Sequence, residues 1–545
     1  MHKNDEIFDF LRKSFLFKTL TDWQMSHLIM DMDIISKHKN DTIYIKNEPA
    51  EYIYFILRGR VSLEIKKGRK VRRFATLNRG DFLGEECVES CFYQARALAL
   101  DDLTLLKYPK ANLISLQNKN PLIMEVLCAT AKSREMVRNE LFDWLSDDEA
   151  VYMIARRHEF FLILKYLVLF MIWIPLIAII RWLNVSYAVF NIVVAALGVL
   201  ATTGIGIWWW KDWRNDYYVV TNKRVIWIER SPFFYESRQE APLISVLSLK
   251  VLTLSGLRLF IDYGNLIVKT YTDEIPMHHI RSPGLMVEFI NGLQSRKREI
   301  TRGNDNEVMD LALRKRLGLL DGKAVKKGGT VEDPNVEQNI YASRRFSYDR
   351  LINVRYEEEE KIIYRKHWFV LVKKIWLQSL VILGILIVFY YLLQSETYNP
   401  FAFGFWITFF VGVVGLWVYQ FLDWCNDIYV VTREKIFDIE RKPLGRENKK
   451  SALLENILSL EHNRVGIIGL YLNYGTVTVN IGAEKFQFFD VYNPAQVQNE
   501  IFVRMTDQQD RLEKLKAAQD RERVADWLAI YHKHTDQSGF SPNSI

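Results

Sequence analysis

Two short motifs between residues 80 and 97 carry the residue types that can hold a small anion. Residues 80–85 read Gly-Asp-Phe-Leu-Gly-Glu, and residues 95–97 read Ala-Arg-Ala. A guanidinium and the free N–H groups of a helix N-terminus attract a singly charged phosphate, and a carboxylate accepts hydrogen bonds from hydroxyl groups. Glycine lets the backbone approach closely. These residue types suit a ligand that carries both a phosphate and a hydroxyl group.

Motifs for catalysis or metal binding do not emerge elsewhere in the sequence. We find no phosphate loop, zinc-ligand spacing, nucleophile elbow or pair of carboxylates. Cys87, Cys91, Cys128 and Cys425 form no metal-ligand pairing and fit a reducing compartment. Cys87 and Cys91, four positions apart, are interpreted as buried small hydrophobic residues rather than oxidant sensors. We therefore expect a protein that is not an enzyme and has no cofactor.

The elements around the two motifs predict a β-roll followed by a helix. Short alternating runs at 42–45 and 52–61 are bounded by turn residues, as strands are. A helix is expected at 121–143, and we expect it to continue through 145–157 toward the first long apolar segment. The β-roll and that apolar segment would then be close neighbours in the chain.

This amino-terminal part, residues 1–145, resembles the cyclic-nucleotide-binding domain of catabolite activators, kinase regulatory subunits and gated channels. The resemblance implies a nucleotide site at Gly84, Glu85, Cys87, Arg96 and Ala97, where Arg96 would hold the phosphate and Glu85 the ribose. The expected ligand is cAMP or cGMP. Ala97 lacks a hydroxyl and is more similar to adenine-preferring members.

A degenerate sensor that binds no ligand is the alternative. Gly84 and Arg96 are 12 positions apart, which is longer than usual for this motif, and Glu86 and Glu89 add negative charge near the proposed phosphate. Either departure would weaken phosphate binding.

Four apolar segments are long enough to cross a bilayer, at 160–180, 187–210, 375–393 and 401–422. Basic residues lie at the ends opposite the two short connecting turns, which predicts that every soluble part is cytoplasmic. Residues 1–20 lack the apolar core of a secretory signal. We expect a multi-pass protein of a prokaryotic plasma (inner) membrane, with both termini in the cytoplasm.

The net charge of +7 favours anionic lipid headgroups as partners and not nucleic acid. Basic residues concentrate beside the apolar segments, and no Lys/Arg stripe interleaved with aromatic residues is present.

The sequence from Asp212 to Thr221 returns from Asp423 to Thr432, at a constant step of 211 residues. Each copy follows a pair of apolar segments, so the repeated unit is a membrane hairpin plus a soluble module. Strands are predicted in the first copy at 217–220, 225–229, 245–254, 257–262 and 265–271, and in the second at 456–460, 469–473 and 476–481. Pro283 and Pro494 are each predicted to open a helix.

The module is similar to the bacterial pleckstrin-homology-like (PH-like) domain of small membrane proteins. The similarity rests on residues 216–226, Tyr263-Gly264 and the Arg-Arg-His before the first apolar segment, with Arg365-Lys366-His367 in the second copy. It implies packing, oligomerisation or proximity to lipid, without catalysis.

The predicted fold class is a multidomain α+β membrane protein. It combines an N-terminal β-roll sensor, four transmembrane helices in two hairpins and two PH-like β domains that each end in a helix. The expected domains are the sensor (1–145), a pre-membrane helix with hairpin 1 (146–210), PH-like domain 1 (211–297), a linker (298–355), hairpin 2 (356–422), PH-like domain 2 (423–505) and an amphipathic C-terminal helix and tail (506–545).

The sequence favours a membrane-anchored receptor or scaffold in which a cyclic-nucleotide sensor is coupled to the membrane helices and tandem modules. The amphipathic tail suits a partner chain, so a homo-oligomer is expected. A gated channel or transporter is an alternative, since Thr202 to Gly206 superficially resembles a potassium filter, and a scaffold with a non-binding sensor is another.

Overall fold

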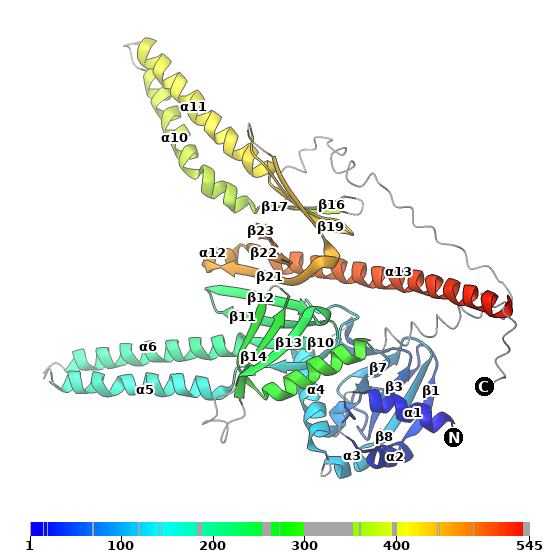
Figure 1. Cartoon of the computed structure of the whole chain (residues 1–545). Helices are drawn as coiled ribbons and strands as arrows, with labels where there is room; N and C mark the ends of the chain where they lie inside the picture. Colours follow the sequence, from blue (N-terminus) through cyan, green and yellow to red (C-terminus); the bar gives the residue numbers. More distant parts are fainter. Residues whose placement is uncertain are drawn as a thin grey trace. The chain divides into compact units, whose positions relative to one another are not determined.

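A computed structural model gives the arrangement of the chain (Figure 1). It describes residues 2–252, 263–298 and 353–537, apart from 15, 19, 68–69, 118–119, 141, 143, 183–187, 272, 359–360, 395–399, 444, 446 and 483. The predicted strand at 257–262 and most of the linker at 298–355 lie outside these residues. The chain divides into two compact units, 1–299 with 458–471, and 300–457 with 472–545.

The first unit begins with the predicted β-roll. Its helices are α1 (His2–Lys13), α2 (Asp22–Met30), the 3-10 helix η1 (Glu85–Val88), α3 (Lys110–Gln117) and α4 (Pro121–Asn139). Its strands are β1 (Asp33–Lys37), β2 (Thr42–Tyr44), β3 (Tyr52–Arg58), β4 (Val61–Lys67), β5 (Lys70–Leu77), β6 (Phe82–Leu83), β7 (Arg96–Ala99) and β8 (Leu103–Pro109). Two four-stranded sheets result, in the orders β1-β8-β3-β6 and β2-β7-β4-β5.

The chain after α4 corrects one prediction. The expected helix across 145–157 is absent, and Val151–Ala155 instead forms strand β9, which pairs antiparallel with β10 (Tyr217–Thr221). Four of its five residues are buried. A strand can bury an apolar run on both of its faces, and this one lies between the module and the sensor. β9 thus begins the strand-rich module before the first pair of long apolar helices in the chain.

The first hairpin consists of α5 (Glu159–Trp182) and α6 (Ala188–Asn215). The module continues with β10, β11 (Arg224–Ser231), β12 (Tyr235–Pro242), the short helix η2 (Leu243–Ser245), β13 (Val246–Leu252), β14 (Tyr263–Thr270) and β15 (Glu274–Arg281). A helix at 283–298 closes it, beginning at Pro283 as predicted. One sheet carries β9 to β12 in sequence order, and the other carries β13-β14-β15.

A single hydrophobic core runs through sensor and module. Its buried residues extend from Ile7 and Leu11 in α1, through Leu127 in α4, to Phe289 and Leu293 in the closing helix. Strand β21 (Ile457–Val465) also packs in this unit, pairing antiparallel with β12, and the short helix α12 (Gly466–Tyr471) follows it. The predicted strand at 469–473 is therefore wrong, because Gly466, with φ of 78°, turns the chain into α12 and the last two of these residues form the turn before β22 (Tyr474–Ile481).

The second unit repeats these elements. Its strands are β16 (Arg355–Glu358), β17 (Lys361–Arg365), β18 (Ile428–Val431), β19 (Lys435–Arg441), β20 (Glu447–Leu453), β22 (Tyr474–Ile481) and β23 (Glu484–Tyr492), with η3 (Leu454–Asn456) after β20. β16 to β20 form one sheet in sequence order. Helix α13 (Pro494–Gln537) joins the predicted closing helix and the predicted tail helix into one.

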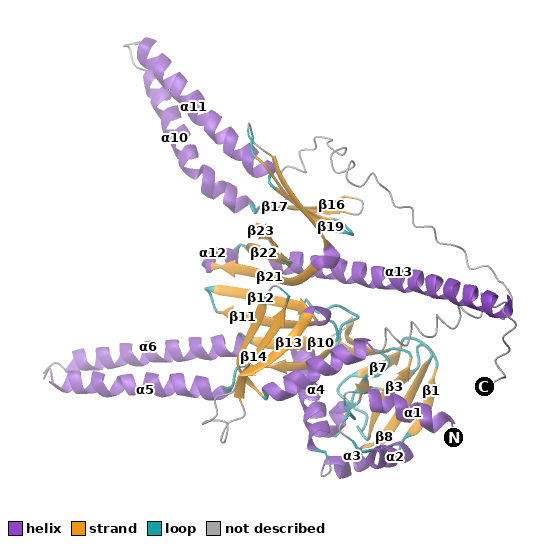
Figure 2. Cartoon of the chain, viewed as in Figure 1, coloured by secondary structure: helices purple, strands orange, loops and turns teal. Residues whose placement is uncertain are grey.

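Among the residues that the structure describes, three helices are long and apolar enough to cross a membrane. These are Ile192–Asn215 in α6, α10 (Trp368–Gln394) and Phe403–Asn426 in α11 (Pro400–Asn426). The fourth predicted segment, 160–180, lies in α5 but is not one of the three. Within each unit a pair of long helices projects from the strand-rich part (Figure 2).

Candidate functional site

The predicted ligand residues Gly84 and Glu85 lie where β6 passes into η1. Gly84 has φ of 84°, and a Cβ atom there would lie 2.7 Å from the carbonyl oxygen of Tyr52 on β3. Any other residue would be strained and would collide with that strand. The glycine is therefore required to seat η1 against the roll.

Glu85 is buried and faces helix α4. Its Oε2 lies 2.8 Å from Nη1 of Arg134, and both side chains are 1% exposed. Arg134 also donates to the carbonyl oxygen of Phe82, and its guanidinium stands over the rings of Phe82 and Tyr152. Arg134 is 49 positions from Glu85, and no local sequence motif marks it as a functional residue.

Arg96 and Ala97 lie at the start of β7. The Arg96 side chain is exposed and donates to Oγ1 of Thr42 (3.1 Å). Ala97 is fully buried, opposite Leu63 of β4. The structure thus presents the guanidinium predicted to hold phosphate to solvent, whereas the predicted ribose carboxylate is paired with Arg134.

Cys87 is buried in η1, where burial, reinforced by the charge of Glu85, raises the pKa of its thiol to about 12. It packs as a small hydrophobic residue, as interpreted from the sequence. Cys91 is exposed, so that interpretation is wrong for Cys91. Within the described ranges, no group of three or more His, Cys, Asp or Glu side chains could hold a metal ion.

Glu86 makes a second contact between η1 and α4. It is 4% exposed and its Oε1 lies 3.0 Å from Nη1 of Arg138. Burial raises the pKa of Glu86 to about 8, with a further contribution from Glu85, while the cations Arg138 and Arg134 oppose the shift. Two adjacent carboxylates of η1 thus face two arginines of α4.

The closing helix of the module reaches into the sensor at the preceding loop. Arg296 donates to the carboxylate of Asp81, to the hydroxyl oxygen of Tyr152 (3.0 Å) and to the carbonyl oxygen of Arg79 (2.7 Å). Tyr152 in β9 donates to the same Asp81, which is 1% exposed. The loop between β5 and β6 is therefore held by two elements of the neighbouring module.

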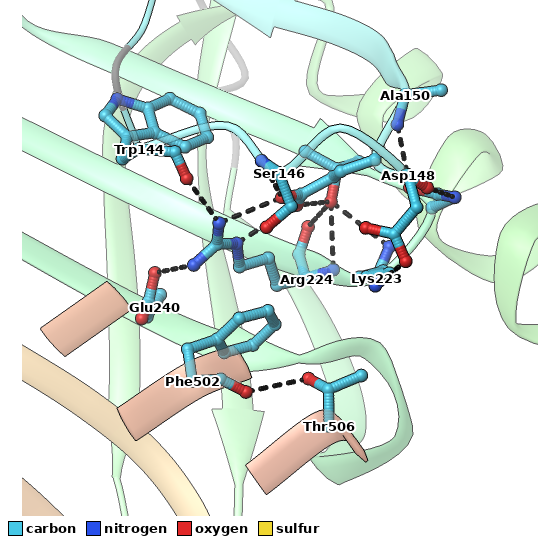
Figure 3. A network of polar contacts seen from close by, with 12 residues as sticks. Trp144, Ser146, Asp148, Ala150, Lys223, Arg224, Glu240, Phe502 and Thr506 are labelled. Carbon is cyan, nitrogen blue, oxygen red and sulfur yellow. Dashed lines mark hydrogen bonds and ion pairs between the residues drawn. The ribbon is translucent and has the colours of Figure 1, made fainter. Parts of the chain in front are cut away.

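The connection from sensor to module is clamped by the turn between β10 and β11 (Figure 3). Arg224 is fully buried and pairs with Glu149 of the connection (2.9 Å) and Glu240 of β12 (2.6 Å). It also donates to the carbonyl oxygen of Trp144 (3.0 Å). The side chain of Asn222 accepts from the backbone N–H of Ala150 (2.9 Å). The Thr-Asn-Lys-Arg motif thus fixes the path of 144–150.

Replacing Glu86 with glutamine tests the raised pKa. A carboxyl whose folded-state pKa lies above its ordinary value of 4.5 contributes stability at low pH, and this contribution is lost as pH rises from about 4.5 through about 8. We expect the melting temperature of the Glu86→Gln protein to fall less steeply across that range than that of the parent. An exposed control, Glu51→Gln, should keep the parental slope, and parallel slopes for Glu86→Gln would contradict the assignment.

Removing the Arg224 side chain tests the clamp. Arg224→Ala removes the cation of the buried Glu149 and leaves Glu240 with Arg238 at 3.9 Å. Breaking a buried pair costs about 3–5 kcal/mol of unfolding free energy. Denaturant unfolding of the detergent-solubilised chain measures the loss. The control Arg230→Ala removes a half-exposed partner of Glu236 and should cost about 1 kcal/mol or less. Equal losses for the two variants would refute the clamp.

Comparison with known proteins assigns part of the first unit. The family described as the cyclic nucleotide-binding domain matches residues 34–120. None of the curated proteins matches the chain.

Several solved structures are each similar to this chain over about a quarter of its length. The sensor domain of the transcriptional regulator DNR from Pseudomonas aeruginosa is 19% identical and covers 27% of this chain and 99% of that one, with a TM-score of 0.24. The Catabolite Activator Protein of Thermus thermophilus is 21% identical, covering 24% and 61%, with a TM-score of 0.21. The regulatory domain of Toxoplasma gondii PKA, crystallised with cAMP, is 17% identical, covering 25% and 50%, with a TM-score of 0.21. By its family match, the segment 34–120 is a cyclic nucleotide-binding domain.

Proposed function

We propose that this chain is a non-enzymatic receptor or scaffold anchored in a prokaryotic plasma membrane, in which a cAMP-like cyclic nucleotide controls a membrane hairpin and tandem PH-like modules. The observation that carries the proposal is a set of contacts made by Arg296, a residue of the module's closing helix. Arg296 donates to Asp81 and Arg79 in the loop between β5 and β6, which we call the sensor loop. Because the sensor shares a buried ion pair with a membrane-attached module, a change of conformation in the sensor would alter the conformation of that module.

The first step of the proposed coupling is at Glu85. A ribose hydroxyl that donates to this carboxylate changes the electrostatic field at Arg134, since both side chains are buried where charges interact strongly. Arg134 contacts Phe82 and Tyr152, and Tyr152 shares Asp81 with Arg296. An ion pair, a cation–ring contact and hydrogen bonds to Asp81 therefore link the proposed ligand residues to the module.

The second step runs from α4 to the membrane helix. The backbone N–H of Ile154 in β9 donates to Oγ of Ser133 in α4 (2.8 Å), so the sensor helix lies directly on the first strand of the module. β9 ends at Ala155, and α5 begins at Glu159. Only residues 156–158 separate the two elements, so a displacement of β9 would also displace the start of α5.

The repeat supports the PH-like interpretation of the modules. β9, β10, β11 and β12 of the first unit correspond in order to β17, β18, β19 and β20 of the second, and each unit has a helix that begins at the matching proline. Two sheets followed by one helix agree with the predicted small, capped barrel. Oligomerisation and lipid proximity, which the resemblance implies, belong to this proposal.

The channel alternative is weaker. Residues 202–206, which superficially resemble a potassium filter, lie inside the continuous helix α6. Their carbonyl oxygens are committed to helical hydrogen bonds, whereas filter carbonyls must point at ions. The alternative of a degenerate sensor has direct support from the solvent-exposed Arg96, and ligand binding decides it.

Calorimetric titration of the full chain in lipid nanodiscs with cAMP and cGMP tests the ligand. We expect binding of cAMP, and we expect Arg96→Ala to weaken it at least tenfold, because a charge-assisted hydrogen bond contributes about 1.5–3 kcal/mol. Arg12→Ala, which changes an exposed arginine of α1, is the control and should bind normally. Absence of heat with both nucleotides would contradict the proposed ligand and favour the alternative, a scaffold whose sensor binds no nucleotide.

Spin-label distances between α4 and α5 test the coupling. With labels at Glu135→Cys and Leu164→Cys, both exposed positions, in a chain that carries Cys91→Ser to remove an exposed native thiol, saturating cAMP should shift the distance distribution. Arg296→Ala should retain cAMP binding but lose the shift, because the sensor loop is released from the module. An unchanged distribution in the parent chain with ligand bound would refute coupling through this path.

A further inference from the structure

The turn between β11 and β12 exposes two adjacent phenylalanines. It runs from Ser231 through Pro232 to Tyr235, and Phe233 and Phe234 are 68% and 57% exposed. Large aromatic side chains contribute strongly to stability when buried, so two of them together at a hairpin tip indicate a contact surface. We define Phe233 and Phe234 as the aromatic tip.

The aromatic tip is held against the end of helix α6. Trp208 of α6 donates from Nε1 to the carbonyl oxygen of Pro232 (3.4 Å), and its ring meets that of Phe234 edge to face at 6.3 Å. Ser231 donates its hydroxyl to Asp212 one turn further along α6. Trp208 belongs to the apolar stretch Ile192–Asn215, which is long enough to span a membrane. The tip is therefore fixed at the depth of the last turns of that stretch.

These last turns have the composition of a membrane interface. Trp208, Trp209 and Trp210 are followed by the exposed Lys211. Tryptophan rings prefer the headgroup level of a bilayer, and a lysine beside them meets anionic headgroups. A side chain in ring contact with Trp208 lies at the same level.

Backbone strain at the tip also needs an explanation. Phe233 has φ of 71°, a conformation in which glycine or asparagine is usual and a bulky residue is strained. The corresponding positions of the second copy carry Leu444 and Gly445, so the module does not need two aromatic residues here in order to fold. Favourable burial of these side chains outside the protein core can offset the free-energy cost of that strain.

Helix α12 extends the apolar surface within the same unit. The backbone N–H of Gly466 donates to the carbonyl oxygen of Phe234 (2.8 Å). Ile467, Ile468 and Tyr471 of α12 are each more than half exposed. The tip and α12 together present aromatic and aliphatic side chains from two hydrogen-bonded segments.

We propose that the aromatic tip, together with α12, inserts into the interfacial layer of the bilayer beside α6, with a membrane containing anionic lipid as its partner. The insertion would fix the orientation of the first module relative to the membrane surface. The proposal rests on the proposed function only in requiring that the chain is membrane-anchored.

Depth measurement with a spin label at Phe233→Cys tests the proposal. The full chain, carrying Cys91→Ser to remove the exposed native thiol, is reconstituted in nanodiscs of phosphatidylcholine and phosphatidylglycerol. We expect relaxation by oxygen, which concentrates in lipid, to exceed relaxation by a water-soluble nickel chelate severalfold. A label at Phe92→Cys, a half-exposed position of the sensor, is the control and should show the reverse order.

Two results would overturn the proposal. Nickel accessibility equal to that of the Phe92→Cys label would place the tip in water, and shielding from both reagents would place it under protein, such as a second copy. Phe234→Cys provides a second label position if the first variant folds poorly. A chain that fails to float with lipid vesicles would refute membrane anchoring itself, whereas a floating chain with a water-exposed tip would refute only the insertion.

Discussion

The contact between Arg296 and Asp81 is the constraint on which the arrangement of the first unit depends. Burying a cation and an anion removes both from water, so such a pair contributes little net stability and instead selects one geometry. The stability comes from the apolar core, which is continuous from α1 of the sensor to the helix at 283–298. Apolar packing alone tolerates sliding, whereas Arg296 meets Asp81, Tyr152 and Arg79 in one register only. Sensor and module are thereby held as one body.

The same reasoning applies to the connection between them. Arg224 satisfies two carboxylates and a carbonyl oxygen at once, so the module holds the path of 144–150 through buried charged contacts. The sensor adds a contact of its own, since the hydroxyl of Thr76 donates to the carbonyl oxygen of Asp147 (2.6 Å). The second copy has Arg433-Glu434 where the first has Asn222-Lys223. In the first copy Asn222 and Lys223 both contact the connection, through Ala150 and Asp148. The two copies have thus diverged at the turn that receives the sensor in the first copy.

In the proposed function, ligand binding and coupling meet at the pair of carboxylates in η1. A carboxylate offers about four acceptor sites, so Glu85 can face Arg134 and still accept from a hydroxyl group. Glu86 is different, because its burial and the neighbouring charge of Glu85 favour its protonated form over its ionised form. The ionisation of this cluster therefore bears on α4, which itself packs against the first strand of the module through Ser133 and Ile154.

The sequence by itself determined the features that arise from neighbouring residues. The β-branched and aromatic runs around Thr221 to Arg224 predicted the β10–β11 hairpin, prolines marked the starts of the closing helices, and the glycine and motif order at 80–97 predicted the roll that the family match supports. The tertiary structure alone decided the roles of Arg134, Arg224 and Arg296. Arg296 lies 215 positions from Asp81, and no local pattern distinguishes a buried arginine from a surface one. Residues 151–155 could also not be assigned from the sequence, because a short apolar run becomes helix or strand according to the surface it packs against, and here that surface comes from β10 and α4.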